Sequence, residues 1–121
     1  MKAIYLKLRQ LIDAGCIFVG HGLKTDFEII NVVVPPEQIR DTVHLFYDPA
    51  EKRKISLRFL AFHLLGDRMM NRMADKHDSI EDARVALQLY KLYLQLKADG
   101  KVQETIAHLY DVGRDTNWVV P

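Results

Sequence analysis

The sequence lacks the features that several protein classes require. Cys16 is its only cysteine, so neither a disulfide framework nor a cysteine-based zinc site can form within one chain. No apolar run approaches the ~20 residues of a membrane-spanning helix. Lys2, Lys7 and Arg9 interrupt the region where a secretory signal would be apolar. The formal net charge is only +1, so bulk charge alone gives no argument for nucleic-acid binding.

The composition is that of an ordinary globular domain. Of the 121 residues, 49% are hydrophobic and 27% are charged, which predicts one domain with a buried core. Apolar periodicity and capping residues predict helices over residues 2–14, from 25 or 26 to 31, 56–65, 79–97 and 101–112. Short apolar runs predict strands over residues 16–19 and 39–43, and the polar residues 67–78 predict a loop.

These elements predict an α/β fold that contains too few strands. The run Cys16–Val19 is entirely apolar, which is typical of a parallel strand covered on both faces. Two short strands cannot form a stable parallel sheet, because such strands need neighbours and cover. We therefore expect residues 1–121 to be the C-terminal portion of a single domain whose first strands are absent.

The turn Gly20-His21-Gly22 follows the first predicted strand but does not complete a nucleotide-binding motif. The dinucleotide fingerprint needs a third glycine where Thr25 stands. A Walker-type phosphate loop needs Lys and Ser/Thr where His21 and Gly22 stand. His21 can instead be a hydrogen-bonded residue that fixes the turn.

Three side chains at the ends of elements have the types that metal-dependent phosphodiester hydrolysis needs: Asp26, His77 and Asp82. Such an enzyme needs carboxylates that converge on cations ~3.5–4 Å apart, and a neutral imidazole can take the proton of the attacking water. Each residue alone has a plainer interpretation. Asp26 and Asp82 can stabilise helix starts, with Ser79 as the cap of the later helix, and His77 can be exposed.

A basic cluster stands beside a predicted helix start. It consists of Lys52, Arg53 and Lys54, with Arg58 four residues after Lys54. Such a cluster can bind a phosphate backbone, although runs of charge are more often a solvated surface. The sequence leaves both interpretations open.

Several segments together resemble the DEDDh family of 3′–5′ exonucleases. Val19–Phe27 is similar to the second motif of that family, and His77–Ala83 is similar to the third, with its histidine five residues before its aspartate. Ile55–Ala61 resembles the helix between these motifs, and Asp41–Val43 resembles the strand end after the second. The resemblance covers essentially the whole chain.

The resemblance implies an RNase H-like exonuclease fold, here mostly helical with a small residual sheet. It implies Mg²⁺-dependent hydrolysis of RNA from the 3′ end with two ions in the complete domain, and Mn²⁺ able to substitute. Asp26 and Asp82 are then metal ligands, and His77 is the general base. The substrate-binding positions that it implies are His21, Gly22, Leu23 and Ser79.

Two further segments, Pro35–Gln38 and Tyr110–Pro121, narrow the resemblance to members that shorten the poly(A) tails of mRNA. This implies release of AMP in the cytoplasm, with no membrane involved. The implied partners are a pseudokinase-like regulatory subunit and, indirectly, poly(A)-binding protein. Two alternatives stay open: another DEDDh nuclease that acts on structured RNA or on DNA, and a non-catalytic remnant that binds RNA or a partner subunit.

One departure from the family concerns its first motif, Asp-x-Glu, which supplies two of four acidic ligands. The only acidic residue before Gly20 is Asp13, at the end of a predicted helix. Two cations would then lack charge compensation. We therefore expect the 121 residues alone to be nearly inactive and to expose an unpaired sheet edge prone to association.

Overall fold

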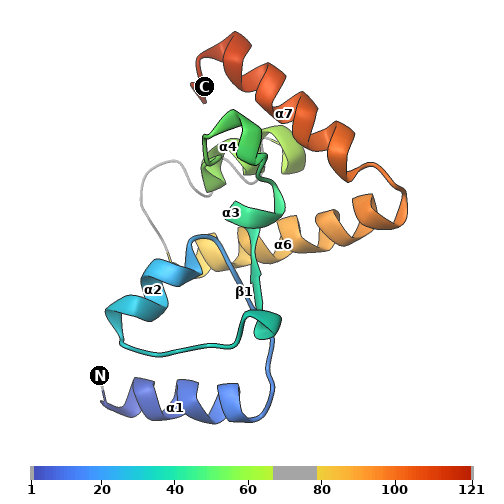
Figure 1. Ribbon diagram of the computed structural model, residues 1–121. Helices are drawn as coiled ribbons and strands as arrows, with labels where there is room; N and C mark the ends of the chain where they lie inside the picture. The colour runs from blue at the N-terminus through green and yellow to red at the C-terminus, as the bar shows by residue number, and fades with distance from the viewer. Residues whose placement is uncertain (1, 67–78, 121) are drawn as a thin grey trace.

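The computed structural model describes residues 2–66 and 79–120, so the predicted loop 67–78, which includes His77, lies outside them. In Figure 1, α1 lies at one end of the molecule and α7 at the other, with the strands and α6 between them. The helices in chain order are α1 (Lys2–Asp13), α2 (Leu23–Ile29), α3 (Thr42–Leu45), α4 (Leu57–Leu60), α6 (Ser79–Ala98) and α7 (Val102–Thr116). The single turns are the 3₁₀ turns η1 (Pro36–Gln38) and η2 (Pro49–Glu51) and the π turn η3 (Ala61–Leu65).

The sheet of the described residues consists of two short parallel strands, β1 (Phe18–Gly20) and β2 (Ile39–Asp41). The register places Gly20 opposite Asp41. Helix α6 packs against β1. The prediction of a mostly helical α/β chain with a small sheet is confirmed, although β1 begins two residues later than predicted.

The second strand ends at Asp41, not at residue 43 as predicted. The carboxylate of Asp41 accepts a hydrogen bond from the backbone N–H of Val43 at 3.1 Å, which caps α3. Thr42 and Val43 therefore belong to a helical turn. β-Branched residues predict a strand here, but a side-chain cap outweighs that preference.

Helix α2 begins at Leu23, so the prediction that Thr25 or Asp26 caps it is wrong. Its N-cap is Gly22, which has φ of 81° and no side chain to act as a cap. The carboxylate of Asp41 accepts hydrogen bonds from the N–H groups of Gly22 and Leu23, both at 2.9 Å. The cap therefore comes from a residue 19 positions later in the chain, which local sequence rules do not detect.

The helix predicted over residues 56–65 begins as expected, since the hydroxyl of Ser56 accepts a hydrogen bond from Phe59 N at 3.1 Å. It does not continue as one α-helix. After α4 the chain forms η3, and Gly66 N donates to Ala61 O at 3.0 Å. Apolar spacing over so few residues does not distinguish the two forms, since Ala61 is buried and residues 62–65 are all partly buried.

Most of the core lies between α3, α4, α6 and α7. Its side chains with at most 2% exposure include Phe46, Ile55, Phe59, Leu60, Val85, Leu89, Leu109 and Tyr110. A second cluster joins α1, α2 and the following segment through Ile12, Phe27, Val32 and Val34. Phe46 and Phe59 are each only 1% exposed, so their rings belong to the core and are not available to stack on bases. Among residues 2–66 and 79–120, none of the helices is long and apolar enough to cross a bilayer.

The last helix ends four residues later than predicted, at Thr116, and is followed by a hook. Asn117 and Trp118 have φ of 54° and 62°, and Trp118 N donates to Gly113 O at 2.8 Å. The indole of Trp118 packs against Tyr110 with ring centroids 5.6 Å apart. A Cβ atom at Gly113 would lie 2.4 Å from the indole ring. The absence of a side chain at Gly113 therefore lets the hook close.

We expect Gly113→Ala to destabilise the protein in urea unfolding by up to about 2 kcal/mol. Helix propensity favours alanine by ~1 kcal/mol, but overpacking of a filled site costs ~1–3 kcal/mol. The control is Gln103→Ala on an exposed position of the same helix, with an expected change within about 0.5 kcal/mol. A more stable Gly113→Ala variant would show that the indole can move away at no cost.

Candidate active site

The carboxyl ends of the two parallel strands meet at Gly20 and Asp41, and ligand sites of open α/β sheets lie at such ends. Asp41 is only 5% exposed. Its carboxylate accepts from three backbone N–H groups, those of Gly22, Leu23 and Val43. One buried side chain therefore fixes the end of β2, the turn after β1 and the start of α2.

His21 stands in this turn and is held by Thr42, which is fully buried. The Nδ1 atom of His21 lies 2.8 Å from the Thr42 hydroxyl oxygen, and that hydroxyl donates to Gly20 O at 3.1 Å. The interpretation of His21 as a hydrogen-bonded residue that fixes the turn is confirmed. Its predicted contact with substrate stays a prediction.

The surroundings of His21 set its charge. Burial lowers the pKa of His21 below its usual value, against the opposing effects of the Asp41 charge, a hydrogen bond to the carbonyl of Ile55 and the Asp82 charge. Nearby His44 lowers that pKa further. The ring is therefore neutral near pH 7.

Gly22 and Leu23 were predicted to contact substrate. Their backbone N–H groups are already bound to Asp41, so these groups are not available to hold a phosphate oxygen. Among the described residues, and apart from Gly22 and its two chain neighbours, no heavy atom lies within 4 Å of the position that a Cβ atom of Gly22 would occupy. A substrate can therefore approach the backbone of Gly22 closely, although the N–H group of Gly22 is bound to Asp41.

The two candidate metal ligands each lie in the first turn of a helix. Asp26 is exposed on α2, while its neighbour Phe27 is buried against the second core cluster. Asp82 is half-buried in the first turn of α6, and its negative charge raises the pKa of His21. Ser79 is the first residue of α6. The predicted base, His77, lies outside the described residues.

Whether these residues suit a metal centre can be judged from the described part of the chain. Within residues 2–66 and 79–120, no three His, Cys, Asp or Glu side chains lie close enough together to hold a metal ion. Asp26 and Asp82 can supply carboxylate oxygens, which are ligands that suit Mg²⁺. The described residues alone therefore do not complete a two-metal centre.

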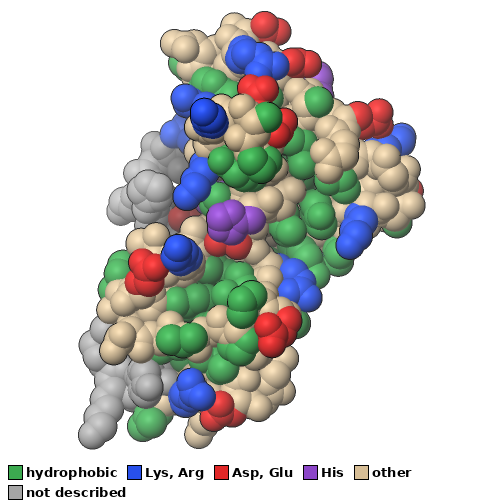
Figure 2. Space-filling view, viewed as in Figure 1, with side chains coloured by type: hydrophobic (Ala, Val, Ile, Leu, Met, Phe, Trp, Pro, Cys, Tyr) green, Lys and Arg blue, Asp and Glu red, His purple; other side chains and the backbone are tan. Residues whose placement is uncertain are grey.

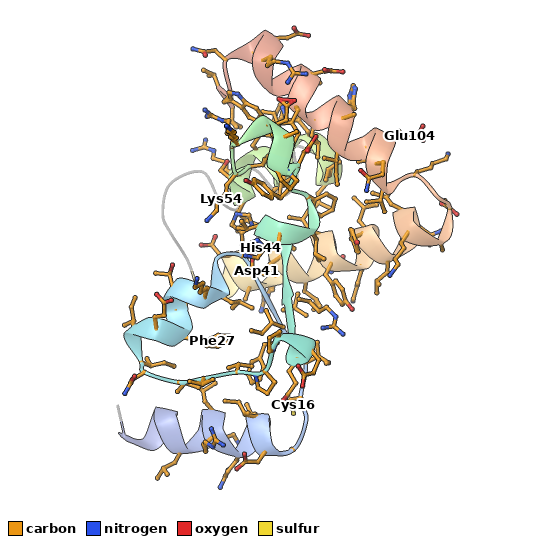
Figure 3. The ribbon with its side chains drawn as sticks, viewed as in Figure 1. Cys16, Phe27, Asp41, His44, Lys54 and Glu104 are labelled. Atoms are coloured by element: carbon orange, nitrogen blue, oxygen red, sulfur yellow. The ribbon has the colours of Figure 1, made fainter. Side chains whose placement is uncertain are left out.

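Asp41 and Thr42 are the residues of this region that the sequence did not identify as functional. The sequence marked them only as the end of a strand. A signal was present, because Asp41 lies within the second predicted strand and the turn Gly20-His21-Gly22 follows the first. In Figure 3, Asp41 and His44 lie close together near the middle of the molecule, with Lys54 just above them.

Sequence comparison relates the chain to exonucleases. The exonuclease family RNase_T matches residues 2–90. The chain is 54% identical, over 94% of its length, to the catalytic subunit pan2 of the PAN2-PAN3 deadenylation complex of Schizosaccharomyces pombe. It is 51% identical over its whole length to the PAN2 subunit of Homo sapiens. The chain spans about 10% of the length of both relatives.

Solved structures show the same fold. One is the Pan2 pseudoubiquitin hydrolase–RNA exonuclease module of Saccharomyces cerevisiae in complex with A7 RNA, with a TM-score of 0.90 and 48% identity. It matches 98% of this chain, which corresponds to 19% of the solved chain. The Pan2 catalytic unit of Neurospora crassa, with its protease and nuclease domain, matches 90% of this chain and 17% of its own, with a TM-score of 0.82 and 45% identity.

Proposed function

Because the chain belongs to the RNase_T family of exonucleases, we propose that it forms part of the catalytic domain of a poly(A)-specific 3′–5′ exoribonuclease. The observation that carries this proposal is the likeness to the Pan2 module solved with A7 RNA, at 48% identity over 98% of the chain. Residues 1–121 would then be the C-terminal portion of one exonuclease domain. The reaction would shorten mRNA poly(A) tails and release AMP.

In this proposal Asp26 and Asp82 are metal ligands and His77 is the general base. Both carboxylates lie in first turns of helices, and α6 packs against the strand whose exit turn holds His21. The proposed ion is Mg²⁺, which when bound by a complete ligand set activates water and stabilises a leaving oxygen. The remaining carboxylates would come from the Asp-x-Glu motif of the family.

The proposed partners follow from the relatives, which are subunits of PAN2-PAN3 deadenylation complexes. We propose a PAN3-like, pseudokinase-like subunit as the protein partner, poly(A) RNA as the substrate, and poly(A)-binding protein as an indirect partner. The proposed compartment is the cytoplasm.

The function is tested with the full-length protein that carries this chain, on an oligoadenylate, a mixed-sequence RNA and an oligodeoxyadenylate. We expect release of AMP from the 3′ end of the oligoadenylate, faster than release from the other two, with loss in EDTA and recovery in Mg²⁺. We expect the 121 residues alone to be nearly inactive on the same panel.

Each alternative predicts a different result on this panel. Equal turnover of all three substrates would indicate an exonuclease without a preference for poly(A). Binding of RNA without turnover in Mg²⁺ would indicate a non-catalytic remnant. Mg²⁺-dependent degradation of the oligoadenylate by the 121 residues alone would contradict the expected dependence on the first acidic motif.

A further inference from the structure

The loop of residues 48–54 is held at both ends by one buried hydroxyl group. Tyr110, on α7, is 1% exposed, and its hydroxyl donates to Arg53 O at 2.6 Å and accepts from Asp48 N at 3.2 Å. Burial raises the pKa of the Tyr110 hydroxyl, so it remains a donor at neutral pH. The backbone of the loop is therefore fixed by a helix that is distant in the sequence.

The charged side chains of this loop fall into two groups. The guanidinium carbon of Arg53 lies 4.5 Å from the centre of the Trp118 ring, so its charge makes a cation–π contact. Both acidic residues of the loop also have partners. The carboxylate of Asp48 accepts a hydrogen bond from Ala50 N at 3.0 Å, and Glu51 forms an ion pair with Arg114. Lys52 and Lys54 are exposed on either side of Arg53. The loop thus presents two exposed ammonium groups, and its five charged residues carry a formal net charge of +1.

The loop leads directly to the candidate site. Lys54 is followed by Ile55, which is 2% exposed and whose backbone is near enough to His21 to raise the pKa of that ring. Figure 3 places Lys54 just above His44 and Asp41. Figure 2 shows Lys and Arg side chains above and beside a histidine in the middle of this face. Lysine and arginine side chains therefore lie around the candidate site, together with carboxylates, one group of which Figure 2 shows directly below the histidine.

We propose that Lys52 and Lys54 bind phosphate groups of the RNA strand that enters the site at His21. The inference rests on the proposed function, which makes RNA the substrate. An ammonium group binds a phosphate as a point charge and reads no base, so this contact strengthens binding of any RNA sequence. A loop that is already fixed loses little conformational entropy when the strand binds. The preference for adenine must then arise from other residues.

The test compares two lysine pairs in the full-length protein. The test variant is Lys52→Ala with Lys54→Ala, and the control is Lys91→Ala with Lys97→Ala, which removes two exposed lysines from α6. Binding of a fluorescent oligoadenylate is measured by anisotropy in EDTA at several salt concentrations. We expect the test variant to bind about tenfold more weakly, and its salt slope to fall by ~1.4, or ~0.7 for each lost contact with a single strand.

Kinetics and two further variants separate a phosphate contact from a general loss of structure. We expect KM to rise with kcat unchanged, because the contact is the same in the ground state and the transition state. Lys52→Arg with Lys54→Arg should keep the salt slope of the parent. Tyr110→Phe keeps both lysines but frees the loop, and it should weaken binding by a smaller factor.

The outcomes distinguish this inference from the proposed function. If the lysine variant and the control bind equally well and with the same salt slope, the phosphate contact is wrong even where AMP release is normal. If the parent releases no AMP but its binding depends on Lys52 and Lys54 as expected, the contact holds and the proposed reaction fails. A parent that binds no oligoadenylate would overturn the contact as well.

Discussion

Asp82→Ala is expected to lower AMP release by the full-length protein by at least ~10³-fold, because loss of the proposed metal ligand would remove several kcal/mol of transition-state stabilisation. The helix content should stay nearly unchanged. Asp82 lies in the first turn of α6, and removal of a helix-start carboxylate costs only ~0.5–2 kcal/mol. The large effect on rate and the small effect on folding are measured by single-turnover kinetics and far-UV circular dichroism.

The matched control for this experiment is Glu104→Ala. Glu104 is an exposed carboxylate in the first turn of α7, far along the chain from the candidate site. Its removal should cost a similar small amount of stability and leave the rate within about twofold of the parent. If Asp82→Ala keeps most of the activity, the metal role is wrong. If its activity falls only in proportion to its folded fraction, Asp82 acts as a helix residue and nothing more.

Local signals in the sequence were sufficient for much of the fold. Ser56 caps the helix that it was predicted to cap, and Gly66 ends it with φ of 92°. The starts of α1 and α6 agree with their apolar periodicity. The exonuclease family that two motifs predicted is confirmed by the match to residues 2–90. These features depend on residues close together in the chain, which is why the sequence alone indicates them.

The start of α2 was missed because a distant residue decides the local structure. Helix α2 begins at Leu23 because Asp41, 18 positions later in the chain, supplies its cap. No periodicity or capping rule applied to a short segment contains that information. The other two errors depend on nearby residues, since Asp41 caps α3 through Val43 and Trp118 packs over Gly113 beyond residue 112. At Thr42 and Val43 the preference of β-branched residues for strands favoured the wrong element.

For the candidate site too, the sequence indicated some residues and missed others. The residue types of Asp26 and Asp82 were visible in the sequence, and the structure places each in a first turn of a helix. Their metal roles stay predictions, as does the role of His77, which lies outside the described residues. Asp41 was not recognised, because its importance depends on the parallel register that sets it opposite Gly20. That register is a property of the sheet, and neither strand alone reveals it.

Asp41→Asn is expected to destabilise the protein by about 2–4 kcal/mol, since a buried carboxylate that accepts three hydrogen bonds is replaced by an amide that can accept on one side only. In the parent, one carboxylate oxygen accepts from Gly22 and Val43, and the other accepts from Leu23. The amide nitrogen of asparagine would face one of these donors. Urea unfolding measures the loss, with Glu28→Gln, an exposed carboxylate on α2, as the control.

The same substitution should also lower kcat at a temperature where the variant is fully folded. Asp41 ties the start of α2 to β2, and α2 carries Asp26. A shift of that helix start by a few tenths of an ångström would displace a proposed ligand, and misplacement of a catalytic group lowers the rate steeply. We expect ~10–100-fold loss in kcat, together with faster amide exchange at Gly22 and Leu23. A folded variant with exchange-labile amides but the parent's kcat would show that the helix start need not be held for turnover, and Asp41 would then serve stability alone.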